Sequence, residues 1–550
     1  MNKKNTPVLV VIALIILVLI AGGISFIINR RTPGTKKADV ESYFGLSSEE
    51  EAAVVVNHQV IDAKALSKDG TYFIDYDTVS GYINGRIYWD KNESKLIITT
   101  PSESVITDVS SGTTPDFYVD GDTGYVSMNL IEQYTTMECQ VLESPNRIVI
   151  ENSDETQITG ADVTEDTQVR EKGGIKSPIL SEMTKGDTVT VLETMDNWSQ
   201  VATEDGYTGY IQNDKLSEIY ELTVPEDDRA AYTSLTRDHK INMVWHQVTA
   251  LAANADIANI VNSMPGVNTI SPTWFSITDN NGNISSFADA GYVQTAHAAG
   301  MEVWGLVDNF STEISSLEIL SHTTSRTNLI NNLIQAAQAV DLDGINLDLE
   351  LISEETGPHY VQFIREMGIA CRKAGLVLSI DDPVPQPYTE HYNRKEQGIV
   401  ADYVIIMGYD EHTSGSEEAG SVASLGFVEA GIENTVAVVP AEKVINGIPF
   451  YTRLWITDGS GNLSSEVYGM DGADKYVSEN GLDVSWDAET GQNYAEKEDD
   501  TGLYQMWMEN EDSITEKLKL VESYDLAGVS AWKLGFQRDS IWSVISQYVN

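Results

Sequence analysis

The chain is poor in the residues that build metal sites and covalent cross-links. Its 550 residues include only two cysteines, Cys139 and Cys371, and eight histidines. Two cysteines are too few for a disulfide framework or a cysteine-rich zinc site, and the histidines lack metal-ligand spacing. Walker-type loops, nucleophile elbows and dinucleotide fingerprints are also absent from the sequence. We therefore expect two free thiols, no metal and no cofactor.

Basic residues are scarce as well. The sequence has 34 Lys and Arg against 84 Asp and Glu, which gives a formal net charge of −50. Such a negative surface repels phosphate backbones and argues against a nucleic-acid partner. Hydrophobic residues make up 41 % of the chain, so most of it is globular. At about 150 residues per domain, the length suggests three to four domains.

One long apolar run lies near the N-terminus. Val8 to Ile28 contains no charged residue, and at about 1.5 Å per residue it can cross a hydrocarbon core of about 30 Å. A cleaved secretory signal would have a shorter apolar core and a small-residue cleavage site. We therefore predict that residues 1–31 form an uncleaved, single-pass anchor that holds the protein in the cell membrane through residues 8–28.

The charges that flank this run favour the opposite orientation from the one we expect. The positive-inside rule keeps the more basic flank in the cytoplasm, and the basic residues after the run outnumber those before it. They are Lys3 and Lys4 before the run, and Arg30, Arg31, Lys36 and Lys37 after it. We still expect the large C-terminal part to be extracellular, because the domains described next are typical of bacterial surface proteins.

A polar linker over 32–50 precedes a β-rich segment over 51–152, in which alternating apolar runs are divided by Gly, Asp and Asn turns. Within it, Tyr72–Ile74 and later Leu96–Ile98 are echoed about fifty residues on by Tyr125–Ser127 and Ile148–Ile150. The segment resembles the stalk repeat called copper amine oxidase N-terminal-like. No copper is implied, because one histidine is no metal site, and we expect a spacer.

The short alternating strands and Gly/Asp turns of residues 160–222 predict a second small β unit. A polar connector follows over 223–238. The unit resembles a bacterial SH3-like domain. The likeness rests on four features: Val169-Arg170, the turn Lys185-Gly186-Asp187, Trp198 before a strand, and Gly209-Tyr210-Ile211. Two roles stay open for such a module, namely binding of cell-wall peptide and passive spacing.

The pattern changes over 239–550, where buried strand runs alternate with helical runs, as in βα units around a parallel sheet. We predict a TIM-type (β/α)8 barrel, with helices over 325–341, 359–375 and 511–525 and a β-rich insertion over about 452–509. The eight strand candidates are INMVWHQV (241–248), NTISPTWFSI (268–277), EVWGLVDN (302–309), GINLDLE (344–350), LVLSIDD (376–382), ADYVIIMGYD (401–410), VINGIPFY (444–451) and AGVSAWKLG (527–535).

The strongest chemical signal is the run Asp343-Gly-Ile-Asn-Leu-Asp-Leu-Glu350 on the fourth predicted strand. Because strand side chains alternate, Asn346, Asp348 and Glu350 share one face. Polar side chains that point into a barrel are costly unless they are hydrogen-bonded or functional. The run resembles the D-x-x-D-x-D-x-E signature of glycoside hydrolase family 18, the chitinase-like barrels, and the resemblance extends over about 239–550.

Further residues agree with this resemblance. Met407-Gly408-Tyr409-Asp410 resembles the family's M-x-Y-D element, and Trp532 on the last strand resembles the tryptophan that forms the floor under the reacting sugar. Trp274 on the second strand is a candidate for the same pocket, since aromatic faces stack on sugar rings. Met407, Trp274 and Trp532 are therefore our expected substrate-binding residues.

The resemblance implies a retaining, substrate-assisted mechanism, in which the substrate's own 2-acetamido oxygen is the nucleophile. Glu350 would be the general acid and then the general base. Asp348 would hold the acetamido N–H, Tyr409 would donate its hydroxyl to the acetamido oxygen, and Asp410 would support sugar contacts. The reacting sugar must then carry an N-acetyl group.

One position departs from the family pattern. Asn346 stands where the family has a third acidic residue, which can share a proton with the middle aspartate. An asparagine cannot share that proton, although its amide can donate a hydrogen bond to Asp348. Because Glu350 is retained, we do not interpret the chain as an inactive enzyme. The variant is closer to the spore- and wall-associated bacterial branch of the family than to secreted chitinases.

These inferences predict a membrane-anchored extracellular glycosidase, acting as a monomer. It would hydrolyse β-1,4 bonds in a glycan that contains N-acetylglucosamine, and we expect that glycan to be peptidoglycan. One alternative is an enzyme that cleaves chitin or N-glycans. A second alternative is a non-catalytic glycan-binding protein on the same barrel. Retained Glu350, Asp348 and Tyr409 count against the second alternative, and Asn346 counts mildly for it.

Overall fold

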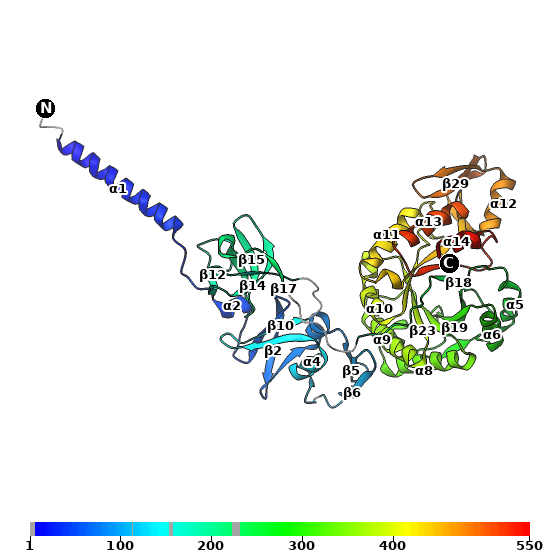
Figure 1. Cartoon of the computed structure of the whole chain (residues 1–550), viewed down its shortest axis with the longest axis horizontal. Coiled ribbons are helices and arrows are strands. Elements are labelled where there is room, and N and C mark those ends of the chain that lie inside the picture. Colours follow the sequence, from blue (N-terminus) through cyan, green and yellow to red (C-terminus); the bar gives the residue numbers. More distant parts are fainter. Residues whose placement is uncertain (1–5, 113, 153–157, 223–230, 550) are drawn as a thin grey trace. The chain divides into compact units, whose positions relative to one another are not determined.

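The computed structural model describes residues 6–112, 114–152, 158–222 and 231–549. Contacts divide the chain into two compact units (Figure 1). The first unit comprises residues 1–87 and 108–229, and the second comprises 88–107 and 230–550. The first half of the predicted connector, residues 223–230, lies outside the described residues, as do Lys3 and Lys4.

The chain begins with a single long helix, α1 (Thr6–Arg31). Its part from Val10 to Arg31 is long and apolar enough to cross a membrane, and none of this stretch is buried in the protein. The helix has no polar face of the kind that a surface helix of a globular domain has. A signal sequence near an N-terminus would share these properties, so the helix is a possible membrane anchor or signal.

The first unit is mainly β, with two seven-stranded sheets. The first sheet has the order β7-β8-β3-β2-β1-β10-β9, and the second has the order β13-β12-β16-β15-β14-β11-β17. The strands of the first are β1 (Glu51–Val56), β2 (Gln59–Lys68), β3 (Thr71–Asp75), β7 (Phe117–Asp120), β8 (Thr123–Ser127), β9 (Met137–Leu142) and β10 (Arg147–Asn152). The strands of the second are β11 (Ile158–Asp162), β12 (Thr167–Arg170), β13 (Ile179–Met183), β14 (Thr188–Thr194), β15 (Trp198–Ala202), β16 (Thr208–Gln212) and β17 (Tyr220–Leu222).

Both sheets contribute to one hydrophobic core, which also includes Phe44 of α2 (Val40–Phe44). Val55 and Val149 of the first sheet pack in the same cluster as Val169 and Val201 of the second. Within the first unit, the stalk-like segment and the SH3-like segment are therefore packed together rather than strung out separately.

The internal repeat has a local structural basis. The side chain of Asp75 accepts a hydrogen bond from the Thr78 backbone N–H at the start of α3 (Tyr76–Thr78), which leads into η1 (Val79–Ile83). At the corresponding place in the second copy, Ser127 accepts from the Leu130 N–H at the start of α4 (Met128–Tyr134). Each copy is thus a strand followed by a capped helical turn and then a β-hairpin.

The second unit contains a closed barrel of eight parallel strands, which confirms the predicted fold class. All eight predicted strands are present. They are β18 (Ile241–His246), β19 (Thr269–Ile277), β21 (Glu302–Asp308), β22 (Gly344–Asp348), β23 (Val377–Pro383), β24 (Tyr403–Met407), β25 (Val444–Pro449) and β31 (Gly528–Trp532). The ring closes because β18 pairs in parallel with both β19 and β31.

Helices cover the outside of this barrel (Figure 1). The three helices that the sequence predicts are α8 (Thr323–Val340), α9 (Gly357–Ala374) and α13 (Glu511–Ser523). The others are α5 (Ile257–Ile260), α6 (Ala290–Ala298), α7 (Ser316–Leu320), α10 (Arg394–Val400), α11 (Leu425–Val436) and α14 (Ile541–Val549). Their apolar faces and the outward side chains of the strands form the largest core of the unit, and a second cluster with Trp245 and Trp304 fills the barrel's interior.

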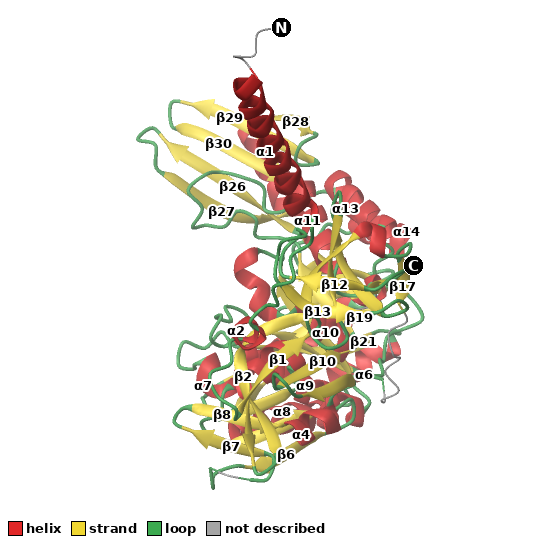
Figure 2. Cartoon of the chain, turned by 90° about the vertical axis from the view of Figure 1, so that its left-hand side faces the viewer, coloured by secondary structure: helices red, strands yellow, loops and turns green. Residues whose placement is uncertain are grey.

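The predicted insertion is a separate antiparallel sheet, which Figure 2 shows projecting beside the barrel. Its order is β27-β26-β30-β29-β28, and one helix, α12 (Met470–Asn480), packs on it. The strands are β26 (Tyr451–Asp458), β27 (Leu463–Gly469), β28 (Asp483–Asp487), β29 (Gln492–Asp499) and β30 (Gly502–Met508).

A small sheet from the N-terminal half of the sequence also belongs to the second unit. It consists of β4 (Ile87–Asp90), β5 (Lys95–Thr99) and β6 (Ser104–Asp108). Asp90 accepts hydrogen bonds from the backbone N–H and hydroxyl of Thr323 at the start of α8, at 2.7 and 2.5 Å. The sequence interpretation places residues 88–107 within the stalk, whereas their contacts in the structure are with the barrel helices.

Candidate active site

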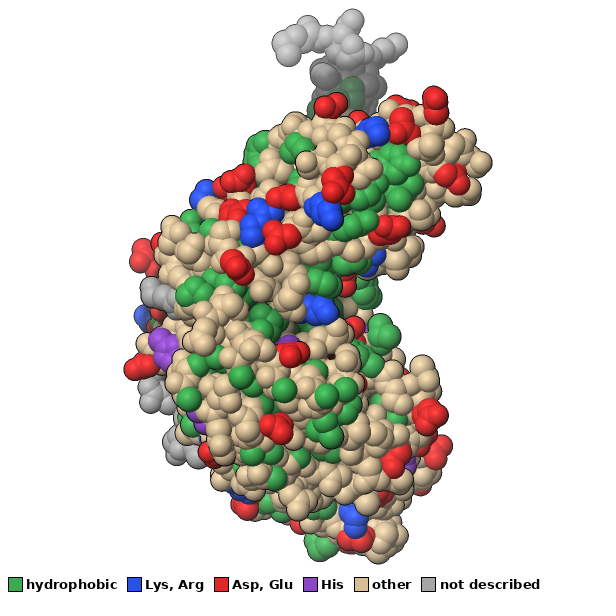
Figure 3. All heavy atoms as spheres, turned by 90° about the vertical axis from the view of Figure 1, so that its right-hand side faces the viewer, with side chains coloured by type: hydrophobic (Ala, Val, Ile, Leu, Met, Phe, Trp, Pro, Cys, Tyr) green, Lys and Arg blue, Asp and Glu red, His purple; other side chains and the backbone are tan. Residues whose placement is uncertain are grey.

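A cavity of about 610 Å³ opens where the barrel strands end at their carboxyl termini. Figure 3 shows the surface recessed between the lobe of the inserted sheet and the rest of the barrel. The cavity wall combines carboxylates with aromatic and aliphatic side chains, as sugar-binding clefts do. Its lining includes Phe310, Asp348, Glu350, Gln386, Tyr388, Met407, Tyr409, Asp410, Glu411, Tyr451 and Trp532.

Asp348 and Glu350 enter this cavity from the end of β22. Asp348 is the last residue of the strand and lies directly opposite Asp308 on β21 in the parallel register. Glu350 follows two residues later, so the alternation of side chains turns both carboxylates to the same side. Asn346 has the same orientation one layer deeper, where it is fully buried.

The backbone of Glu350 is held on both sides by a single side chain. The Asn309 amide donates to the Glu350 carbonyl oxygen at 2.8 Å, and its own oxygen accepts from the Glu350 N–H at 3.0 Å. Burial raises the pKa of the Glu350 carboxyl, and the negative charge of Asp410 raises it further. A carboxyl in this environment keeps its proton to higher pH than a free one, as a general acid requires.

Asp348 is more deeply buried, with only 6 % of the residue exposed. Its Oδ1 atom has no hydrogen-bond partner among the described residues. Burial raises the pKa of Asp348 well above its usual range, and the neighbouring Glu350 and Asp308 charges act in the same direction. An unpaired oxygen so placed can accept a donor group from a ligand in the cavity.

The Asn346 amide can donate a hydrogen bond to Asp348, but in the structure it makes other contacts. The Asn346 amide donates to the Ser379 hydroxyl at 3.1 Å and to the Asp381 carboxyl at 2.7 Å, both on β23. Its oxygen accepts from the Trp245 indole at 2.9 Å and the Ser271 hydroxyl at 3.0 Å. All its polar atoms are thus used within the barrel interior, which leaves no N–H for Asp348.

Asp381 is a member of this cluster that the sequence analysis does not select. Its carboxyl is almost completely buried, and its pKa is raised well above the usual range by burial and by the charge of Asp348. The signal for it is the same alternation that identifies Asp348, because Ser379 and Asp381 interrupt the apolar run of β23 at every second residue. A carboxyl therefore does lie next to Asn346, but the neighbouring strand supplies it.

Tyr409 and Asp410 lie at the end of β24, beside Met407, and all three line the cavity. Burial raises the pKa of the Tyr409 hydroxyl well above its usual range, so that it stays a hydrogen-bond donor. Asp410 accepts a hydrogen bond from the Tyr451 hydroxyl at 2.6 Å. Tyr451 is the first residue of β26, so the inserted subdomain also contributes to this wall.

Trp532 ends the last barrel strand and lines the cavity, with its ring 6.0 Å from that of Trp245. The structure places Trp274 elsewhere. Its ring is buried between the sheet and the outer helices, where it packs against Tyr292 and its indole donates to Asn254 at 2.9 Å. A register irregularity between Thr273 and Phe275 in β19 accompanies this outward orientation.

The described residues contain no group of three or more His, Cys, Asp or Glu side chains arranged to hold a metal ion. His246, at the end of β18, lies in the core, where its Nδ1 is 2.8 Å from the Tyr292 hydroxyl. Both cysteines are free thiols, as expected, with Cys371 buried and Cys139 partly buried.

Comparison with known families finds two matches in the chain, one in the barrel and one in the SH3-like segment. Residues 287–537 match the family described as glycosyl hydrolases family 18, and residues 165–217 match the bacterial SH3 domain. Among curated proteins, the chain is 28 % identical over 290 residues to YdhD of Bacillus subtilis, whose name describes a sporulation-specific glycosylase; the match covers 52 % of this chain and 63 % of YdhD. It is 25 % identical over 252 residues to the cortical fragment-lytic enzyme of Bacillus subtilis, covering 44 % of this chain and 57 % of that enzyme.

The chain thus spans less than two thirds of the length of these two relatives. Among solved structures, it resembles the spore cortex-lytic enzyme SleL of Bacillus cereus, with a TM-score of 0.51 and 18 % identity over 60 % of this chain and 77 % of SleL. At this identity the likeness concerns the fold. The resemblance of residues 51–152 to a copper amine oxidase N-terminal-like repeat stays a prediction.

Proposed function

We propose that this protein, whose barrel carries a glycoside hydrolase family 18 domain, hydrolyses β-1,4 bonds of peptidoglycan on the N-acetylglucosamine side. The observation that carries the proposal is the pair of the buried Asp348 and the partly buried Glu350, whose carboxyls have raised pKa values at the end of β22 in an aromatic-lined cavity. Relatives of the barrel include enzymes named for lysis of spore cortex fragments. Peptidoglycan is therefore the first polymer to test.

Glu350 is the proposed acid and base. Its raised pKa favours the protonated form that can donate to the glycosidic oxygen, and the Asn309 contacts fix the backbone from which it reaches the bond. Once the leaving group has gone, the same carboxylate can take a proton from water. The cycle balances, because the proton given to the leaving oxygen is replaced by one from the attacking water.

Asp348 and Tyr409 are the proposed partners of the acetamido group. The free Oδ1 of Asp348 is an acceptor for the acetamido N–H, and the Tyr409 hydroxyl is a donor for the acetamido oxygen. Held in this way, that oxygen attacks the anomeric carbon and gives a cyclic oxazolinium-type intermediate, which water then opens. Trp532 is the proposed floor beneath the reacting sugar, with Met407 and Asp410 as further contacts.

We further propose that α1 anchors the protein in the cell membrane and that the barrel acts outside the cell as a monomer. The helix has the length and composition for a single span. The bacterial SH3 domain over 165–217 agrees with a place within the wall, where its task would be either binding of cell-wall peptide or spacing.

The test is hydrolysis of purified peptidoglycan by the full-length protein in detergent, with Glu350→Gln as the matched control and chitin oligomers as the second substrate. We expect fragments with N-acetylglucosamine at the new reducing end, identified by mass spectrometry, from the unchanged protein only. Cleavage of chitin oligomers but not of peptidoglycan would reject the proposed substrate. Binding without cleavage of either polymer would reject the proposed enzyme.

A further inference from the structure

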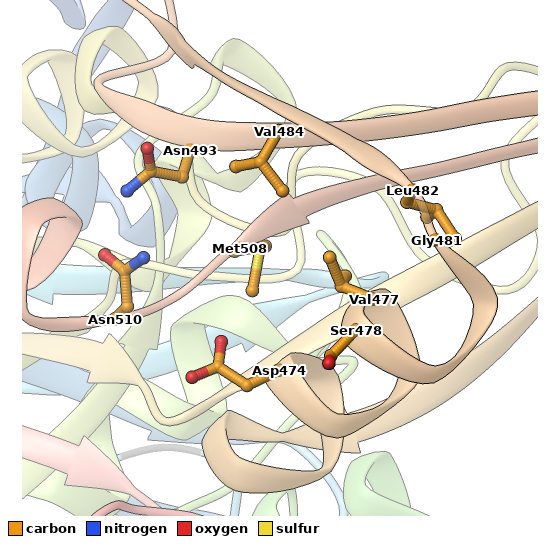
Figure 4. Close-up of a pocket in the computed structure, with 9 residues that line it drawn as sticks. All are labelled: Asp474, Val477, Ser478, Gly481, Leu482, Val484, Asn493, Met508 and Asn510. Carbon is orange, nitrogen blue, oxygen red and sulfur yellow. The ribbon is translucent and has the colours of Figure 1, made fainter.

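The inserted subdomain contains a second cavity, of about 480 Å³, that the reaction described above does not use. It lies where the end of α12 meets β28, β29 and β30 (Figure 4). Its apolar floor consists of Val477, Leu482, Val484 and Met508. Three polar side chains, Asp474, Asn493 and Asn510, stand along one side of it.

The cavity lies beside the last turns of the helix that packs on the sheet. α12 packs on the sheet through Ala473 and Val477 and then stops at Gly481, whose φ of 65° is left-handed and ends the helix. In the register of the sheet, Trp486 pairs with Asn493, and Asn493 pairs with Met508. This row of three residues crosses the sheet beside the cavity.

The row is unevenly covered. Met508 is buried, whereas Trp486 is 46 % exposed, and Val484, two residues earlier on the same face of β28, is 51 % exposed. The exposed indole and the exposed valine lie two residues apart on one face of the strand, so together they form a small apolar surface next to the cavity. Aromatic faces of this kind stack on sugar rings.

The polar side offers hydrogen-bonding groups of both kinds. The Asn510 oxygen accepts from the backbone N–H groups of Asp512 and Ser513, at 3.1 and 3.3 Å, and so caps α13. Its amide nitrogen is therefore the free end, and Figure 4 shows it on the side of Met508. The Asn493 amide nitrogen donates to the Asp512 carboxylate at 3.1 Å, so the Asn493 oxygen is the group left for a ligand. The carboxylate of Asp474 completes this side of the cavity.

The charge around the cavity selects against anions. One cation, Arg538, contacts Asp471 at 2.9 Å, Glu511 at 3.1 Å and also Asp474. Three carboxylates around a single guanidinium leave the rim negative, so phosphate or carboxylate ligands are repelled. A neutral ligand with hydroxyl groups on one edge and a small apolar group on another fits both the polar side and the apolar floor.

We propose that this cavity, together with the indole of Trp486, is a second glycan-binding site that holds one N-acetylated sugar of the polymer. The sugar's hydroxyl groups face Asn493 and Asn510, its acetyl methyl group faces Val484 and Met508, and its ring face lies on the indole. The inference rests on the proposed function, since it assumes that the polymer contains N-acetylglucosamine.

The same sheet connects the two cavities. Tyr451 at the start of β26 lines the active-site cavity, and the second cavity lies at β28 on an edge of the sheet. A site fixed to the barrel in this way increases the local concentration of a long chain near Glu350, but offers nothing to a substrate too short to reach it. Its effect is therefore confined to polymers.

The sheet offers matched variants, because its two edge strands each expose a valine to a similar degree. Val484 on β28 is 51 % exposed at the cavity, and Val467 on β27, at the opposite edge, is 45 % exposed. The variants are Trp486→Ala and Val484→Ser, with Val467→Ser as the control. Each is made in the full-length protein that also carries Glu350→Gln, and binding to insoluble peptidoglycan and chitin is measured by co-sedimentation in detergent.

We expect Trp486→Ala to weaken binding to at least one of these polymers about tenfold and Val484→Ser to weaken it less, with no change in Val467→Ser. In the background with Glu350 intact, kcat/KM should fall on the polymer and stay unchanged on a trisaccharide. Binding that Trp486→Ala leaves unchanged, or that Val467→Ser weakens equally, would overturn the second site. If neither polymer is cleaved by the unchanged protein, the proposed function fails, whereas selective loss of binding in Trp486→Ala would still support the second site.

Discussion

The barrel unit buries carboxylates in two contrasting ways. Glu509 is completely buried, and its oxygens accept from Lys517 at 2.9 and 3.0 Å, from Gln492 at 2.7 Å and from Ser513 at 2.7 Å. Asp348 is nearly as deeply buried, but its Oδ1 has no partner among the described residues. Burial of an unpaired acid is costly, so its retention at the mouth of the barrel indicates a role for the protonated state or for a ligand.

The contrast extends to the neighbours of each acid. Burial is the larger cause of the raised pKa values of Asp348 and Asp381. The charge of Glu350 raises the pKa of Asp348 further, and the charges of Asp348 and Glu350 raise that of Asp381. At Glu509, burial raises the pKa as well, but the Lys517 ammonium acts against it. The environment of the first cluster therefore favours protonated carboxyls, while the Glu509–Lys517 pair connects α13 to the inserted sheet.

The largest expected effect is on catalysis at the unpaired cluster. Glu350→Gln removes the proton donor but keeps the size of the side chain, so we expect turnover to fall by about 10²–10⁴-fold with little change in thermal stability. The measurement is the initial rate on peptidoglycan together with the Tm. A rate near that of the unchanged protein would show that another residue is the acid.

Mutation of the Glu509–Lys517 pair should instead change stability. Lys517→Met leaves Glu509 buried without its cation, and we expect the free energy of unfolding to drop by about 3–5 kcal/mol. Lys519→Met on the same helix is the control, because Lys519 pairs with Glu516 at the surface, where such a pair contributes about 0.5 kcal/mol or less. Urea unfolding of both variants is the measurement. Equal losses would mean that the buried pair contributes no more than the exposed one.

How far the sequence predicts this arrangement depends on the range of the interactions. The alternation of side chains is local, so Asn346, Asp348 and Glu350 could be assigned to one face from the sequence alone, and the eight strands followed from their apolar runs. The partner of Asn346 could not, because Asp381 comes from another strand and the pairing is set by the barrel register. For the same reason Trp274 could be placed on the correct strand but not on the correct side of it.

The sequence also leaves open which surface covers residues 88–107, for a related reason. The hairpin residues Leu96–Ile98 and Ile148–Ile150 have the same apolar pattern, and both segments are buried. The apolar pattern predicts that both segments are buried, but it does not indicate which other part of the protein buries them. In the structure, the hairpin of the second copy lies in the sheet of the first unit, whereas the hairpin of the first copy belongs with the barrel helices.

Neutralising Asp381 should have a smaller effect on thermal stability. The direction of the change in Tm is the informative result. The pKa of Asp381 in the folded protein is raised above the unfolded value of about 3.9, so the folded state binds the proton more tightly. Stability therefore falls as pH rises from the unfolded pKa toward the folded one. Asp381→Asn removes this penalty and can still accept from Asn346, so we expect the Tm to rise by a few degrees at pH 7 and to change less at pH 4.

Calorimetry at the two pH values tests that expectation. A Tm that falls at pH 7 would mean that the Asp381 charge is stabilised in the folded state after all. The pH dependence of kcat should change in the same variant, since the carboxyl whose charge raises the pKa of Asp381 is Asp348 itself.

The smallest expected effect concerns a third way of burying an acid, in which hydrogen-bond donors contact the Asp90 carboxylate and the Arg326 guanidinium interacts with it electrostatically. Asp90 accepts both from the backbone N–H and from the hydroxyl of Thr323 at the first turn of α8. Asp90→Ala should lower the free energy of unfolding by about 1–2 kcal/mol, as loss of a helix cap does. Glu93 makes similar contacts with Thr324 one residue later, but in solvent, so Glu93→Ala is the control and should cost about 0.5 kcal/mol or less. If the two variants lose equal stability, the buried position of Asp90 adds nothing, and residues 88–107 would be only loosely held on the barrel helices.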